Sequence, residues 1–456
     1  MNYTMKNIST LKKEIFSAAL FPLYLVNFIG VLGFSMVIPF LYILVQRLGG
    51  SPVIYGLISA SYPLFQLVGA PLLGRWSDRI GRKKVLIVSQ AGTFIAWAAL
   101  LSALYLPHTF KYAYDSPAFG LFVLTLPLVV IFFSRAFDGL TGGNVAVANA
   151  FLADLTPAAG RSKNYGRLSI SSNLGFVIGP ALAGLLGGTV YREALPIFAA
   201  LVISAIAILV IAYFLPEKPP KKPAAVEQFP VKVHGKKMFS IFRIEGVLGL
   251  FIMYFFIFFA FNTYYTAFPV HVVEEFRWDI SAIGYFFSVL SLLMILVQGP
   301  LLQSLSGKTA ETTLVLLGSF LLIFNFGLLV LNAEWGVYSS MFLFALGNGL
   351  MWPSFLSLLS QKGTEKNQGQ IQGTAGAFGS LASIAGLIVG GAVYAQLGAN
   401  IFSLSVLSIL IVTLYFLASG RQKKTSTGGE SQPKYCSLLP CSIFLHNNKT
   451  GKQKNR

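Results

Sequence analysis

The sequence predicts an all-α polytopic membrane protein. Of its 456 residues, 55% are hydrophobic and only 11% are charged, whereas soluble domains average roughly 45–50% and 25%. Apolar runs such as 51–73 and 85–107 contain no charged residue, and a helix needs about 20 such residues to cross ~30 Å of hydrocarbon. In lipid, each backbone polar group needs a partner inside the protein, which long helices provide.

The apolar runs predict about twelve helices in two six-helix halves. A Pro- and Lys-rich linker, 216–243, separates an N-terminal half, 16–215, from a C-terminal half, 244–419, and polar tails cover 1–15 and 420–456. We expect spans near 16–46, 52–74, 83–105, 121–153, 166–188, 195–215, 244–270, 280–303, 312–332, 337–360, 371–396 and 400–419. The fourth is overlong, so we expect it to kink or to emerge from the membrane at Gly142-Gly143.

The distribution of basic residues predicts the orientation. With both termini in the cytoplasm, 29 Lys and Arg fall in inside segments and 4 in outside segments, as the positive-inside rule requires. Orientation therefore explains the net charge of +18 better than a nucleic-acid partner does. We expect a monomer embedded in a lipid bilayer, in the inner membrane of a bacterium.

A charged stretch from Gly74 to Lys84 separates the second and third spans. It carries five basic residues and one acid, and we interpret it as a tight cytoplasmic loop. Asp78 can pair there with Arg79 or Arg82, or face the positive N-terminus of a nearby helix. The pattern G-x-x-x-D-R-x-G-R-K resembles the motif between the second and third helices of major facilitator superfamily transporters. The resemblance implies a conformational switch, whose residues here are Gly74, Asp78, Arg79, Gly81, Arg82 and Lys83.

An internal repeat supports two related halves. Pro71-Leu72-Leu73 with Ser77 and Arg79 recurs as Pro300-Leu301-Leu302 with Ser306 and Lys308, and Gly307 stands where the first copy has Asp78. Such repeats predict a binding site between the halves and rocking of one half on the other. We expect Asp78 to hold the cytoplasmic ends together, against the start of the eleventh helix, when the site opens outward.

The fourth span contains an unusual pair of charges. Arg135 and Asp138 lie three residues apart, so they share a helix face and can form an ion pair. Charged groups within the membrane are costly and are functional candidates by default, although a structural, self-neutralising pair is the alternative. Arg135 and Gly139 also resemble the fourth-helix motif of the superfamily, which implies a role for Arg135 in proton coupling. We predict Asp138, the acid beside it, as the proton-binding group.

The fifth span contains Gly175, Gly179, Pro180 and Gly184. This spacing allows close helix packing, and the proline removes a backbone donor and favours a kink. The pattern resembles the fifth-helix motif of drug:proton antiporters, which implies export. Residues 368–373 and 380–384, and the run Thr141–Thr156, resemble the twelve-helix tetracycline-efflux branch.

Three departures from that branch concern its membrane-embedded carboxylates. The corresponding positions in the first, third and ninth helices are Asn27, Ala96 and Leu322, none of which can bind a proton. Tetracycline is therefore a poor substrate prediction. Proton coupling must use Asp138 or a carboxylate nearer the surface, such as Asp154.

The candidate substrate cavity is predicted to be polar and aromatic with few charges, which suits a hydrophobic or aromatic organic compound. Its candidate lining residues are Asn27, Asn144, Asn262, Tyr264, Tyr265, Asn348 and Trp352. Most aromatic residues of the seventh span, which include Tyr264 and Tyr265, are expected to pack inside the protein or to contact lipid, and a minority to line the cavity.

These patterns favour a secondary active exporter of small organic compounds, with the proton gradient as energy source and no cofactor. A metabolite importer or facilitator on the same fold, and a non-transporting receptor or scaffold, remain the alternatives. We predict no enzyme activity and no metal site, because the four histidines fall in loops or near helix ends without partners at catalytic or metal-ligand spacing. Cys436 and Cys441 lie together in the tail and indicate no disulfide framework.

Overall fold

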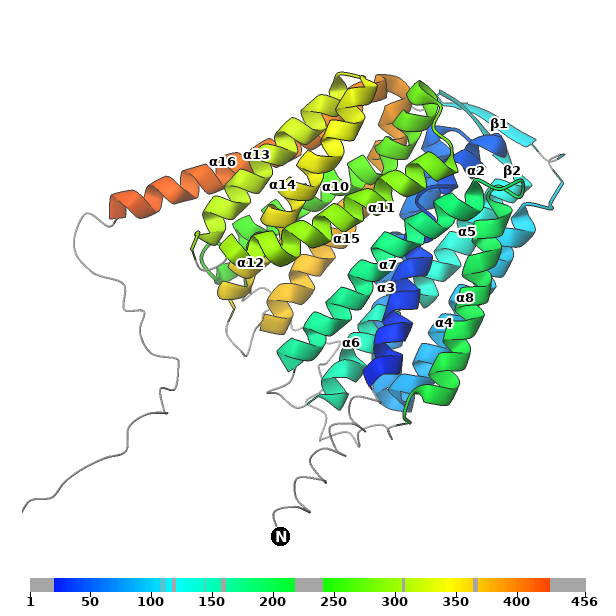
Figure 1. Cartoon of the computed structure of the whole chain (residues 1–456), viewed down its shortest axis with the longest axis horizontal. Coiled ribbons are helices and arrows are strands. Elements are labelled where there is room, and N and C mark those ends of the chain that lie inside the picture. Colours follow the sequence, from blue (N-terminus) through cyan, green and yellow to red (C-terminus); the bar gives the residue numbers. More distant parts are fainter. Residues whose placement is uncertain are drawn as a thin grey trace, which may run out of the picture. The chain divides into compact units, whose positions relative to one another are not determined.

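The structure is a computed structural model that describes residues 20–107, 109, 111–116, 120–142, 144–156, 161–217, 241–305, 308–363 and 368–426. It is built almost entirely of helices (Figure 1). The first helix is Leu20–Met36, followed by α2 (Leu41–Arg47), α3 (Pro52–Ile80), α4 (Arg82–Ala103), β1 (Lys111–Ser116), β2 (Gly120–Thr125), α5 (Leu126–Thr141), α6 (Asn144–Leu155), α7 (Arg161–Gly187), α8 (Ala194–Phe214), η2 (Ile241–Arg243), α10 (Val247–Phe276), α11 (Ile280–Leu296), η3 (Val297–Leu301), α12 (Leu302–Leu305), α13 (Glu311–Val330), α14 (Glu334–Gln361), α15 (Gln368–Leu397), η4 (Gly398–Ile401) and α16 (Phe402–Ser426).

The helices agree with the predicted membrane spans. Among the described residues, nine segments are long and apolar enough to cross a membrane, and the first helix with α2, bent by 41°, makes a tenth. One of the nine, 370–418, covers both α15 and α16. The fourth predicted span is divided between α5 and α6 because the helix stops at Gly142, where the glycine pair was expected to interrupt it.

Two local predictions were wrong. The segment 121–125 was expected to begin a helix, but it is strand β2, which pairs with β1 in an antiparallel hairpin. The stretch 74–84 was expected to be a loop, but α3 continues to Ile80 and α4 begins at Arg82. Its charged residues are compatible with a helix, so the turn is confined to Gly81, whose φ of 105° favours glycine.

The histidine prediction also needs correction. Helix α10 continues to Phe276, beyond the expected end at residue 270, so His271 lies inside the helix and is fully buried. Its Nδ1 atom is 3.2 Å from the hydroxyl of Tyr394 in α15. Burial against a partner from another helix explains this histidine as part of the C-terminal half's packing.

The two halves meet at one end of the bundle, which we call the outer end, where α3 begins, α7 ends and α11 begins. Helix α3 lies against α15, and α7 lies against α11 (Figure 1). A Cβ atom on Gly56 of α3 would lie 2.9 Å from the carbonyl oxygen of Leu387 in α15. One on Gly284 of α11 would lie 2.5 Å from the carbonyl oxygen of Pro180 in α7. These glycines allow the halves to approach within backbone contact.

The opposite end, which we call the inner end, is where α3 ends and α15 begins. There the same helix pairs leave their small residues uncovered: among the described residues, nothing lies within 4 Å of a Cβ placed on Gly74 of α3, or on Gly373 or Gly376 of α15. The α3 side chains of Leu64, Val68 and Leu72 are about half exposed. The halves are therefore in contact at the outer end and separated at the inner end.

The predicted domain boundaries mostly fall where the structure gives no description. Residues 218–240 of the expected linker, 1–19 of the N-terminal segment and 427–456 of the tail lie outside the described part. The contacts divide the chain into a unit Met1–Leu417 and a second unit Ala418–Arg456.

Candidate functional site

Helix α5 places two opposite charges inside the N-terminal half. Arg135 and Asp138 lie three residues apart on one face, and Arg135 Nη1 donates to Asp138 Oδ2 at 2.9 Å. Their side chains are only 7% and 10% exposed. A charge buried alone is strongly destabilising, so the pairing offsets the cost of burying either group. The predicted pairing is therefore present in the structure, whereas its role in proton coupling stays a prediction.

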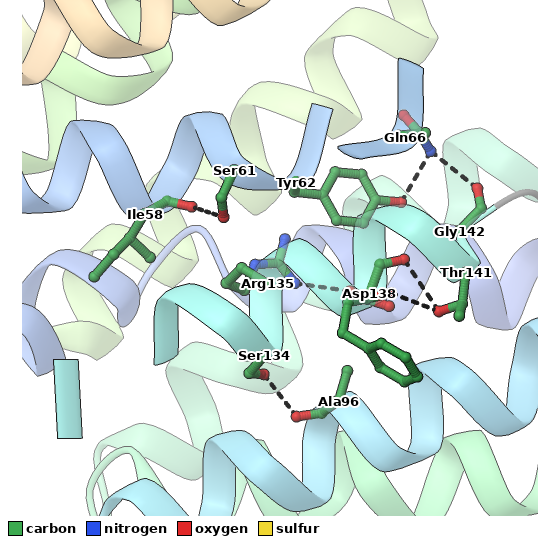
Figure 2. Close-up of polar contacts among 11 residues, drawn as sticks. Ile58, Ser61, Tyr62, Gln66, Ala96, Ser134, Arg135, Asp138, Thr141 and Gly142 are labelled. Carbon is green, nitrogen blue, oxygen red and sulfur yellow. Dashed lines mark hydrogen bonds and ion pairs between the residues drawn. The ribbon is translucent and has the colours of Figure 1, made fainter. Parts of the chain in front are cut away.

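Tyr62 of α3 covers this ion pair. The guanidinium carbon of Arg135 lies 4.8 Å from the centroid of the Tyr62 ring, a cation–π contact. Gln66, one turn further along α3, donates to the Tyr62 hydroxyl at 3.1 Å and to the carbonyl oxygen of Gly142 at 3.0 Å (Figure 2). The ring is thereby held over the charges, and Gln66 also ties α3 to the end of α5.

Close backbone packing positions α5 between α3 and α4. A Cβ atom on Gly139 would collide with the carbonyl oxygen of Tyr62, and one on Gly69 would collide with that of Leu140. On the α4 side, Ser134 donates to the carbonyl oxygen of Ala96 at 2.7 Å (Figure 2). The glycine at 139 therefore has a packing reason, because it allows α3 to approach the ion pair.

A small polar pocket opens beside Asp138. Gln90, Thr93 and Trp97 of α4 line it together with Tyr62 and residues of the first helix. The side-chain oxygen of Gln90 is buried and has no hydrogen-bond partner in the described structure, which suits a polar occupant such as water. Gln66 and Gln90 were missed in the sequence, although two glutamines within otherwise apolar spans are a signal that could have found them.

The structure does not bring the predicted cavity residues into one cluster. Asn27 is buried and donates to Leu168, Ser171 and Ser172 of α7, at distances of 3.1, 2.9 and 2.7 Å. It therefore ties the first helix to α7. The side chain of Asn144 lies outside the described residues.

The other five candidates belong to the C-terminal half. Tyr264 is fully buried and stacks on Phe344 at 4.9 Å, so its position is one of packing rather than cavity lining. Asn262 donates to Ser383 of α15 at 3.0 Å. Half-buried Tyr265 and Trp352 and buried Asn348 complete the set; Trp352 packs against Tyr254 and Phe258 at 5.2 Å.

The glycine motif of the fifth span serves two different neighbours. Cβ atoms on Gly175 and Gly179 of α7 would collide with the first helix, whereas one on Gly184 would lie 3.1 Å from the Cα of Gly284 in α11. Pro180 lies inside α7 without ending it. One motif therefore packs α7 within its own half and also against the other half.

The charged residues of the switch form a network at the inner end. Arg82 pairs with Asp78 at 2.5 Å and with Asp154 of α6 at 3.1 Å. Asp78 is 61% exposed, and Arg79 is exposed. The prediction that Asp78 pairs with Arg79 or Arg82 is thus met by Arg82. Its contact with the start of the eleventh helix, expected when the site opens outward, stays a prediction.

The family model described as Major Facilitator Superfamily matches residues 23–387, which include both halves. The chain belongs to the Major Facilitator Superfamily. It is therefore a membrane transporter with that superfamily's all-α fold.

Several members of the superfamily resemble this chain. The class D tetracycline resistance protein of Salmonella ordonez is 28% identical over 75% of this chain and 80% of its own length. Human major facilitator superfamily domain-containing protein 10 is 26% identical over 78% and 76%. The crystal structure of the human organic anion transporter MFSD10 has a TM-score of 0.62 at 20% identity, covering 88% of this chain and 99% of that one. A bacterial homologue of the lysosomal transporter Spinster, inward-facing and unoccupied, has a TM-score of 0.69 at 12% identity, covering 91% and 99%. Both structures support the fold alone.

Proposed function

We propose that this superfamily member exports small hydrophobic or aromatic organic compounds from the cytoplasm in exchange for protons. The Arg135–Asp138 pair supports this proposal most directly, because it places a carboxylate in a membrane helix, where protonation can be coupled to transport. The tetracycline resistance proteins among its relatives support the direction. We place the protein in a bacterial inner membrane with both termini in the cytoplasm.

The ion pair suggests how protons and substrate exchange. With Asp138 ionised, its charge is balanced by Arg135. A proton on Asp138 removes that balance and leaves Arg135 under Tyr62 without its anion. Binding of a proton and binding of substrate then favour different arrangements of α3 and α5. Alternating access follows if those arrangements open different ends of the contact between the halves.

Profiling cells with and without the protein tests this proposal. We expect cells that express it to tolerate, and accumulate less of, several hydrophobic or aromatic compounds, with an effect that is lost in Asp138→Asn. Equal accumulation in both cell types across the panel would contradict export.

We predict that tetracycline is not a substrate. The positions that correspond to membrane carboxylates of the tetracycline-efflux branch are Asn27, Ala96 and Leu322, all of them buried. None offers a charge to a metal-bound drug, so we expect the minimal inhibitory concentration of tetracycline to change less than about twofold on expression. A large increase would show that another part of the chain recognises the drug.

An importer or facilitator is the second candidate. The same three uncharged positions favour it, because each removes a carboxylate that could carry a proton. Asp138, buried beside Arg135 in α5, is the acid that is left for this task within the described N-terminal helices. Such a protein would equilibrate its substrate without responding to a proton gradient.

A further inference from the structure

Helix α2 contacts both halves at the outer end. The chain bends by 41° between the first helix and α2, so this short helix takes its own direction. Arg47, at its end, forms an ion pair of 2.9 Å with Glu193, which is 1% exposed and precedes α8. Arg47 itself is 40% exposed, and the pair with buried Glu193 anchors α2 to the N-terminal half.

The same helix reaches across to the C-terminal half. The hydroxyl of Tyr42 donates to Glu274 Oε1 of α10, and Gln46 Nε2 donates to the same oxygen at 2.9 Å. Tyr42 is buried and its ring packs edge-on against Tyr55 of α3 at 5.2 Å, so its hydroxyl is aimed at α10 by the N-terminal half.

Glu274 receives its hydrogen bonds only while the outer end is closed. Among the described residues, Glu274 has no ion-pair partner, and its two neutral donors both come from the other half. Hydrogen bonds to an ionised carboxylate are stronger than neutral ones. Separation of the halves at this end therefore removes the donors from a half-buried carboxylate.

Glu275, the next residue, provides an internal comparison. It accepts a hydrogen bond of 3.1 Å from Asn332, which lies in its own half. Opening the outer end leaves that bond intact. When the halves separate, Glu274 therefore loses its hydrogen-bond donors, whereas Glu275 keeps its donor.

We infer that Tyr42, Gln46 and Glu274 form a latch that holds the outer end closed and stabilises the state in which the inner end is open. The inference rests on the proposed alternating access. Weakening the latch shifts the population toward the state that is open at the outer end. No member of the latch is required to touch the transported compound.

The latch is tested by measuring how often the outer end opens. Replacing Cys436 and Cys441 by serine gives a background without native cysteines. The reporter is Ile280→Cys, because Ile280 is 3% exposed and packs against Gly187 across the contact between the halves. The protein is reconstituted in proteoliposomes, and its labelling by a membrane-impermeant maleimide is timed.

We expect Tyr42→Phe, which removes one charge-assisted hydrogen bond, to accelerate labelling at position 280 by about tenfold. Glu274→Ala removes both hydrogen bonds across the latch, so we expect it to accelerate labelling at least as much. Glu275→Gln, which removes the same charge, leaves the rate unchanged. A second reporter, Gly376→Cys at the exposed inner end, separates opening from unfolding. Alternating access closes the inner end when the outer end opens and slows labelling there, whereas unfolding leaves position 376 accessible.

Rates for Tyr42→Phe and Glu274→Ala that match Glu275→Gln would overturn the latch, as would equal acceleration at both reporters. Labelling does not depend on transport. Accelerated labelling in a protein that exports nothing would therefore remove the proposed function and leave the latch in place.

Discussion

Asp138→Asn is expected to abolish proton-driven transport while leaving a protein that folds and inserts. Asparagine keeps the shape of the side chain but cannot take up a proton. It also leaves Arg135, which is 7% exposed, without its anion, and breaking a buried pair costs on the order of 3–5 kcal/mol. We therefore expect concentrative transport to fall to background and the thermal stability of the purified protein to decrease.

The measurement is accumulation of the compound selected by profiling, in proteoliposomes with an imposed pH gradient. Asp279→Asn is the matched control: Asp279 caps α11 by accepting from the backbone of Ala282 at 2.8 Å, and asparagine is an equally good cap. Wild-type accumulation in Asp138→Asn would move the proton site elsewhere. Asp154, the other sequence candidate, would then be the next variant to test.

Locking the outer end is expected to stop transport reversibly. A Cβ atom on Gly188 would lie 3.7 Å from the Cβ of Ser281, close to the mean of about 3.8 Å in disulfides. These residues belong to different halves. In the cysteine-free background, Gly188→Cys with Ser281→Cys should form a disulfide on oxidation, and the halves can no longer separate there.

We expect export to fall to background after oxidation and to recover with a reducing agent. Each single cysteine variant should transport normally under both conditions, which controls for oxidation damage. Undiminished transport by a fully cross-linked protein would show that the contact between α7 and α11 does not open during the cycle.

Much of the fold followed from local patterns, because a membrane helix is determined by its own residues. The break at Gly142 was predicted from a glycine pair within an overlong apolar run. The hairpin of β1 and β2 was missed since its second strand continues an apolar run without a clear boundary. The length of α3 was underestimated because charge was interpreted as loop, although only Gly81 interrupts the helix.

The candidate site was predicted less completely. Arg135 and Asp138 share one helix turn, so their spacing was sufficient to predict the pair. Tyr62 and Gln90 come from other helices, and their approach depends on glycine contacts between segments distant in the sequence. Tyr62 and Gln90 were missed, whereas Tyr264 was proposed as a cavity residue without lining one. Its polar hydroxyl suggested a cavity, but its ring packs among Phe268, Phe326 and Phe344.

The exchange of compound for protons is tested most directly in sealed proteoliposomes with an acidic interior and a clamped membrane potential. We predict that the compound selected by profiling accumulates inside above its external concentration, that a pH-sensitive dye reports proton loss at the same time, and that a protonophore abolishes both. Entry only to equal concentrations, with or without the pH gradient, would contradict proton exchange and identify a facilitator.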